Sequence, residues 1–84
     1  MRGDLVILKS YGNEPLARRV WDENDNTVFV TNDEQLNKLL MREDAIAPIG
    51  FKREFVFRYD PLIAETMDIL YKKGEFDWNK LIRY

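Results

Sequence analysis

Two adjacent arginines and a tryptophan lie in one strand-like stretch, PLARRVW, which covers residues 15–21. Arg and Trp contribute strongly at protein interfaces, because each joins a large contact area to planar hydrogen-bonding groups. Alternate side chains of a strand share a face, so Arg19 and Trp21 lie on one face and Arg18 lies on the other. These residue types indicate non-covalent binding rather than catalysis.

The residue types on which most enzymes rely are missing. The chain has no histidine and no cysteine, which removes the commonest general base, the commonest transition-metal ligands and any thiolate nucleophile. Without cysteine there is no disulfide, which fits a reducing cytoplasm. We therefore expect no enzymatic activity, no cofactor and no structural metal.

Carboxylates gather at a predicted hairpin tip, where Asp22, Glu23 and Asp25 lie close together in the sequence. Their spacing differs from that of a calcium-binding loop, which needs oxygen ligands at fixed alternate positions. We interpret the cluster as a solvated turn rather than a metal site.

Basic and aromatic residues are interleaved in the predicted strands, a combination that suits a platform for single-stranded nucleic acid. The residues concerned are Lys9, Arg18, Arg19, Lys52, Arg53 and Arg58, together with Phe51, Phe55 and Tyr59. The net charge of −2 weakens this hypothesis, because affinity for nucleic acid rests largely on positive charge.

Short apolar or alternating runs predict the strands that position these residues. The continuous aliphatic run at 5–8 is typical of a strand buried on both faces. The turn-forming sequence GNEP at 12–15 separates it from PLARRVW, and a polar tip separates PLARRVW from the β-branched run at 27–31. A further strand is expected within 51–59, where aromatic residues alternate.

The hairpin between the second and third strands has two open registers, which place Trp21 on opposite faces. A three-residue tip at 24–26 puts Trp21 opposite Phe29 and Arg19 opposite Thr31. That register also gathers three valines on the core-facing side: Val20, Val28 and Val30. We favour this register because the core-facing side near the hairpin then holds valines alone, whereas an even tip would place Trp21 among them.

The predicted pair of Trp21 and Phe29, with Arg19 beside it, has two open interpretations. The C-terminal segment covers it, or it is exposed as an anchor for a partner.

We interpret Arg18 as a rim residue paired with a carboxylate. Trp78, in the apolar stretch at 76–84, packs on its own domain or reaches a partner. The candidate partner-binding residues are Arg18, Arg19, Trp21, Phe29 and Trp78.

Capping signals predict two helices. The first is a short helix near 33–42, with Thr31 or Asn32 as its N-cap. The second runs from the Asp60 N-cap to a Gly74 stop, with Pro61 in the first turn. Its apolar stripe includes Ile63, Met67 and Leu70, which predicts that one face is buried.

These elements predict a single, mainly β domain over 1–84, with a small barrel at 3–59 and a helical C-terminal extension at 60–84. The pattern resembles a Src-homology-3-like small barrel, on the GDLV opening, the RRVW…VFVT hairpin and the REFVF strand. The tyrosine-rich motif that binds proline peptides in the signalling domains has no equivalent here. The resemblance therefore implies the fold and no particular activity.

We expect a non-enzymatic interaction module that binds another protein, with self-association as a homodimer one form of this. Single-stranded nucleic-acid binding is the alternative. The acidic, cysteine-free composition would suit a phage or mobile-element accessory protein. No signal peptide or membrane-spanning run is evident, so a soluble, cytoplasmic protein is expected.

Overall fold

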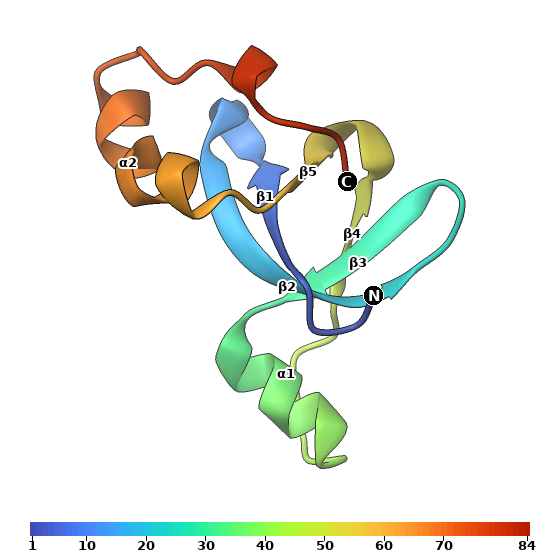
Figure 1. The fold of residues 1–84 in the computed structure, drawn as a ribbon. Coiled ribbons are helices and arrows are strands. Elements are labelled where there is room, and N and C mark those ends of the chain that lie inside the picture. The colour runs from blue at the N-terminus through green and yellow to red at the C-terminus, as the bar shows by residue number, and fades with distance from the viewer.

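Five strands form one antiparallel sheet in the computed structural model, which describes residues 1–84 (Figure 1). They are β1 (Leu5–Lys9), β2 (Pro15–Glu23), β3 (Thr27–Thr31), β4 (Ile49–Lys52) and β5 (Val56–Arg58). Their order is β4-β3-β2-β1-β5, and the sheet does not close on itself. The expected barrel is therefore not confirmed: with two helices, the chain is a small mixed α/β domain.

The central strand β1 is buried on both faces, as its aliphatic run predicts. Val6 and Leu8 face one side of the sheet, here called the inner face, and Ile7 faces the other side, the outer face. Valines of three further strands complete the inner core: Val20, Val28, Val30 and Val56. The sheet therefore has two apolar faces, and each needs a cover.

Helix α2 (Pro61–Lys72) covers the outer face, as its apolar stripe predicts. The Asp60 side chain caps it by accepting a 2.9 Å hydrogen bond from the Leu62 N–H, and Gly74 follows it with a left-handed φ of 71°. Met67 is buried in one cluster with Ile7 and Phe57 of the sheet. Helix and sheet thus share one core.

The C-terminal segment packs on its own domain and lies along the edge of β5 (Figure 1). The Arg58 N–H donates to the Ile82 carbonyl at 2.7 Å, and the Tyr84 N–H donates to the Val56 carbonyl at 3.1 Å. Phe57 pairs with Arg83 between these two bonds. The segment therefore acts as a short added strand on β5.

The β2–β3 hairpin uses both registers, one on each side of a β-bulge. Arg19 lies opposite Thr31, as in the register that we favoured, and the three valines do share the inner core. The ladder then shifts between Val20 and Asp22, so that Asp22 rather than Trp21 lies opposite Phe29. The expected pairing of Trp21 with Phe29 is wrong, because the bulge leaves Trp21 without a partner.

The region predicted as one strand within 51–59 contains two. Strand β4 starts earlier, at Ile49, and a 3-10 turn at Arg53–Phe55 separates it from β5. The aromatic alternation that suggested a single strand therefore spans a turn, and the sequence AIAPIG, expected only to end a helix, already includes the start of β4.

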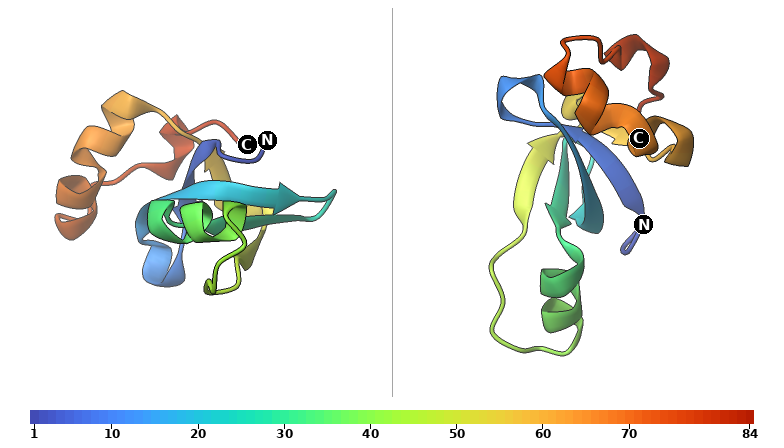
Figure 2. Two further views of the ribbon diagram at one scale, coloured as in Figure 1. Left: turned by 90° about the horizontal axis from the view of Figure 1, so that it is seen from below. Right: turned by 90° about the vertical axis from the view of Figure 1, so that its left-hand side faces the viewer.

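Helix α1 (Asp33–Leu40) projects from one end of the sheet, away from α2 (Figures 1 and 2). Asn32, one of the two expected caps, accepts a 2.8 Å hydrogen bond from the Gln35 N–H. The helix ends at Leu40, slightly before the predicted boundary near 42. Neither α1 nor α2 has the length and apolar character that a membrane crossing requires.

Candidate functional site

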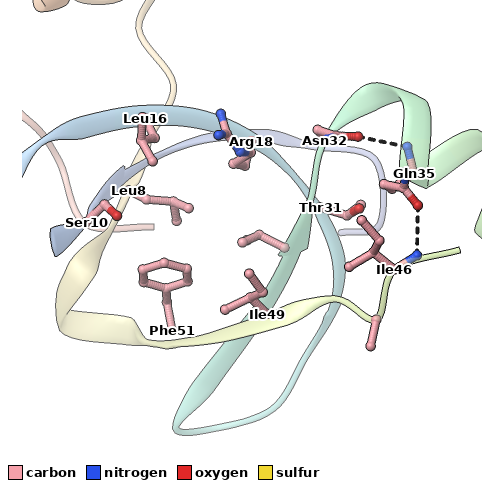
Figure 3. Close-up of a pocket in the computed structure, with 12 residues that line it drawn as sticks. Leu8, Ser10, Leu16, Arg18, Thr31, Asn32, Gln35, Ile46, Ile49 and Phe51 are labelled. Atoms are coloured by element: carbon pink, nitrogen blue, oxygen red, sulfur yellow. Dashed lines mark hydrogen bonds between the residues drawn. The ribbon is translucent and has the colours of Figure 1, made fainter.

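A groove of about 300 Å³ lies on the inner face of the sheet, between β4 on one side and the ends of β1 and β2 on the other (Figure 3). Helix α1 and the segment that follows it close one end. The side chains that matter most for its chemistry are Leu8, Leu16, Arg18, Ile46, Ile49 and Phe51. The groove is therefore mainly apolar, with one cation in its wall.

The alternation of β2 explains why Arg18 lies in this wall. Leu16, Arg18 and Val20 point to the inner face, and Arg18 lies opposite Val6 in the β1–β2 ladder. An arginine thus occupies a position in the row of core-facing residues. Arg18 is half-buried and lines the groove, as expected for a long side chain that packs its aliphatic stem and keeps its charged end near water.

Arg18 has no carboxylate partner, contrary to the expectation that it would be ion-paired. Its Nη1 donates to the Ala17 carbonyl at 2.7 Å, and it takes part in none of the ion pairs of the structure. No acidic side chain lines the groove. A guanidinium has five N–H donors, so Arg18 retains donors for an acceptor from outside the molecule.

Arg19, by contrast, is engaged within the domain. Its Nε donates to Asp33 Oδ1 at 2.8 Å and its Nη1 donates to the Gly3 carbonyl at 3.1 Å. These bonds join β2 to the first turn of α1 and to the chain before β1. The geometry gives Arg19 a structural role.

Trp21 is covered by a residue that neither sequence interpretation considered. The Arg2 guanidinium lies 3.9 Å from the ring centroid of Trp21, and Arg2 Nε donates to the Trp21 carbonyl at 2.7 Å. Phe29 is half-buried on the outer face, against Gly50 of β4. The two aromatic rings therefore lie in separate environments and do not form one patch.

Trp78 packs into the outer core. Its ring centroid lies 5.1 Å from that of Phe57 and 4.8 Å from that of Phe76, and Lys9 Nζ lies 5.5 Å above it. Of the candidate partner-binding residues, Arg18 alone lines the groove.

Exposed apolar side chains occur at the groove and also at the C-terminal end of α1. Leu40 is 55% exposed, Met41 71%, Ile46 70% and Ile49 63%. Ile46 is fixed at the groove because its N–H donates to the buried Gln35 side chain at 2.8 Å (Figure 3). Sequence reasoning missed Ile46 and Ile49, although their apolar character within a supposed connecting segment was the available signal.

The two chain ends meet away from the groove, in a cluster of ionised groups. The Met1 ammonium donates to Asp4 at 2.8 Å, to Glu23 at 3.1 Å and to the Tyr84 hydroxyl. The hydrogen bond from Met1 lowers the pKa of Asp4, and one from Arg53 at 2.9 Å does most to lower the pKa of Glu23. Partial burial, with these carboxylates nearby, raises the pKa of Tyr84.

The acidic hairpin tip brings no metal-like cluster together. Asp22 accepts a 2.8 Å hydrogen bond from the Glu23 N–H, while the Glu23 side chain turns to Arg53. Nowhere in the chain do three potential metal-ligating side chains converge.

Comparisons of the chain with protein-family models, with curated proteins and with solved structures find no match. The groove, its unpaired cation and the neighbouring apolar surface are therefore the basis for inferring function.

Proposed function

We propose that the protein is a non-enzymatic interaction module that binds a segment of another protein in the groove of the inner face. The observation that carries this proposal is Arg18, a guanidinium without a carboxylate partner in the wall of a mainly apolar groove. A segment with apolar side chains and one carboxylate would complement both features.

A partner segment would gain binding energy at two parts of this surface, the Arg18 guanidinium and the apolar side chains of the groove. Bidentate hydrogen bonds between arginine and a carboxylate are strong where water is partly excluded, and they fix orientation as well. The exposed side chains of Ile46 and Ile49 line the same groove as Arg18 and add apolar area there. Apolar surface next to a groove is typical of an interaction site.

We further propose that the domain is an open relative of the Src-homology-3-like barrel. The strand order β4-β3-β2-β1-β5 and the 3-10 turn between β4 and β5 support this assignment.

A selection of random ten-residue peptides displayed on phage, made against the whole domain, tests the proposal. We expect selected peptides to bind through the groove, so that Ile46→Glu weakens binding by about tenfold or more. Leu62→Glu is the matched control, since Leu62 is 78% exposed on α2 and does not line the groove. Both changes are at exposed positions and should leave the fold intact.

Two results would contradict this function. One is a selection that yields no binders, and the other is a set of binders that tolerates Ile46→Glu as well as Leu62→Glu. Binding of a single-stranded oligonucleotide at low salt, in place of peptides, would instead favour the alternative function.

Single-stranded nucleic acid has weaker support than a peptide. Arg19 and Arg53, two of the basic residues that suggested it, are paired with Asp33 and Glu23. Lys9 and Arg83 lack such partners, but each already lies over an aromatic ring of its own domain. Those rings are therefore less available for stacking with bases.

A further inference from the structure

We infer that the partner segment binds as an additional β-strand on the free edge of β4, and that it is an extended peptide in which apolar residues alternate and one carboxylate reaches Arg18. This inference rests on the proposed function and specifies the chemistry and conformation of the ligand. Strand addition is a recurrent mode of peptide recognition, in which backbone bonds supply affinity and alternate side chains supply specificity.

The two edges of the sheet differ in how they are covered. On β5, the C-terminal segment supplies hydrogen bonds through Ile82 and Tyr84. On β4, no backbone or side-chain group of the chain bonds to the outward-facing edge. The molecule thus completes one edge with its own chain and leaves the other available.

The β3–β4 ladder identifies which backbone groups of β4 are free. The Arg53 N–H donates to the Asn26 carbonyl at 3.2 Å, and Thr27 lies opposite Lys52 in the ladder. Hydrogen-bonded and non-hydrogen-bonded pairs alternate in an antiparallel ladder. Gly50 and Lys52 therefore occupy non-hydrogen-bonded positions relative to β3, and their N–H and carbonyl groups point away from it.

The pleat of an added strand would direct every second side chain into the groove. Side chains of neighbouring strands in register share a face. On β4, Ile49 and Phe51 point into the groove, so the alternate residues of an added strand would lie beside them. They would then face Leu16 and Arg18 on the opposite wall. Apolar residues and one carboxylate at these positions match that wall.

Charge favours a foreign acidic peptide over a second copy of this chain paired through the same edge. The sequence of β4, IGFK, contains no carboxylate that could meet Arg18. Two such strands would also bring two Lys52 side chains to one junction. Lysine on a short edge strand opposes indiscriminate edge pairing.

A proline substitution tests the backbone contact directly. Lys52 has a φ of −60°, which a proline ring accepts, and its N–H makes no bond to β3, so Lys52→Pro should fold normally. Lys52→Ala is the matched control, because it removes the same charge but keeps the N–H. With a peptide selected as above, we expect Lys52→Pro to weaken binding about tenfold more than Lys52→Ala does.

Amide hydrogen exchange provides a second measurement on the unmodified chain. Saturating peptide should slow exchange at the Gly50 and Lys52 N–H groups by about tenfold or more, because both become hydrogen-bonded.

Arg18→Met, which keeps the apolar stem but removes the donors, should reduce the affinity for peptides that contain a carboxylate. It should have little effect on the same peptides with glutamine in that place.

The outcomes separate this inference from the proposed function. If Ile46→Glu abolishes binding but Lys52→Pro and Lys52→Ala bind equally, the groove is a binding site and strand addition is wrong. Unchanged exchange at Gly50 and Lys52, or selected peptides rich in proline and lacking carboxylates, would also overturn it. If no peptide binds through the groove, the proposed function itself fails.

Discussion

The two helices begin with the same local signals but differ in burial, because α2 has a buried apolar residue, Met67, and α1 has none. Both α1 and α2 have an Asn or Asp cap whose side chain accepts a backbone N–H, and both have apolar residues at helical spacing. Met67 of α2 is only 7% exposed, whereas Leu40 of α1 is 55% exposed. The same pattern thus predicts a helix in each case but does not determine what covers its apolar face.

The difference follows from the surface that each helix meets. The outer face offers α2 the side chains of Ile7 and Phe57, with the C-terminal segment completing the cover. Helix α1 lies at the end of the sheet, where its first turn is tied to β2 through Arg19 and Asp33. Its later residues extend past the strands. On the proposed function, α2 serves stability, whereas the groove that α1 helps to close serves binding.

The largest expected effect is a difference in stability between truncations of these two helices. Met67→Ala should lower the free energy of unfolding by about 2–5 kcal/mol, because it leaves a cavity in the outer core. Leu40→Ala should change it by less than about 0.5–1 kcal/mol, since the side chain is mostly in water. Urea unfolding of both variants measures the contrast.

Comparable losses of unfolding free energy from Met67→Ala and Leu40→Ala would contradict this contrast, since they would mean that α1 packs as firmly as α2. A domain has only about 5–15 kcal/mol of stability in all, so the larger loss is easily measured.

A second contrast, of intermediate size, concerns the two tryptophans. Trp78 contacts Phe57 and Phe76, so Trp78→Ala should cost about 2–3 kcal/mol, less than the ~3–5 kcal/mol typical of a fully buried aromatic side chain. Trp21 stacks mainly on Arg2, and Trp21→Ala should cost about 1 kcal/mol, the size of an exposed cation–π contact. Thermal unfolding of the two variants, with sedimentation to detect any change in size, gives the measurement.

The control for this contrast is Arg2→Ala, which removes the group above Trp21 but leaves the ring in place. It should have about the same effect as Trp21→Ala. If Trp21→Ala were instead neutral for folding but altered the sedimentation of the protein, Trp21 would be an intermolecular contact after all.

Much of the sheet was predictable because its signals are local. The run at 5–8 indicated a strand buried on both faces, and the inner-face valines follow from the hairpin register up to Val20. The bulge at Trp21 was not predictable, since either register satisfies the local pattern and the structure uses one on each side of the bulge. A one-residue shift of this kind changes which side chains face each other.

The candidate groove was largely hidden in the sequence, for a physical reason. Arg18 was noted, but its place in an apolar groove depends on β4, which comes from the far side of α1 in the sequence. Ile46 and Ile49 lie in a stretch with Pro48, and that stretch indicated a connection rather than part of a site. Predicting a site assembled from distant segments requires the tertiary structure, whereas predicting a strand requires only the residues of that strand.

The smallest expected effect is a pH dependence of stability, which should involve the ionised cluster at the chain ends and not the groove. In the folded chain that starts at Met1, hydrogen bonds from Arg53 and the Met1 ammonium lower the pKa of Glu23 below its ordinary 4.5. A carboxyl group whose pKa is lower in the folded state stabilises the fold at pH values above its unfolded pKa. That contribution is lost as the pH falls through the folded pKa.

Acidification from pH 6 to pH 3 should therefore reduce stability, and Glu23→Gln should lose less over this range than the wild-type chain does. Glu23 is partly exposed, so solvent screening keeps the difference small. Glu65→Gln is the control, because Glu65 is exposed on α2 and makes no ion pair. No carboxylate lines the groove, so acidification should leave the groove itself unchanged. A pH dependence of Glu23→Gln equal to that of the wild type, measured by urea unfolding at each pH, would show that this cluster does not couple protonation to folding.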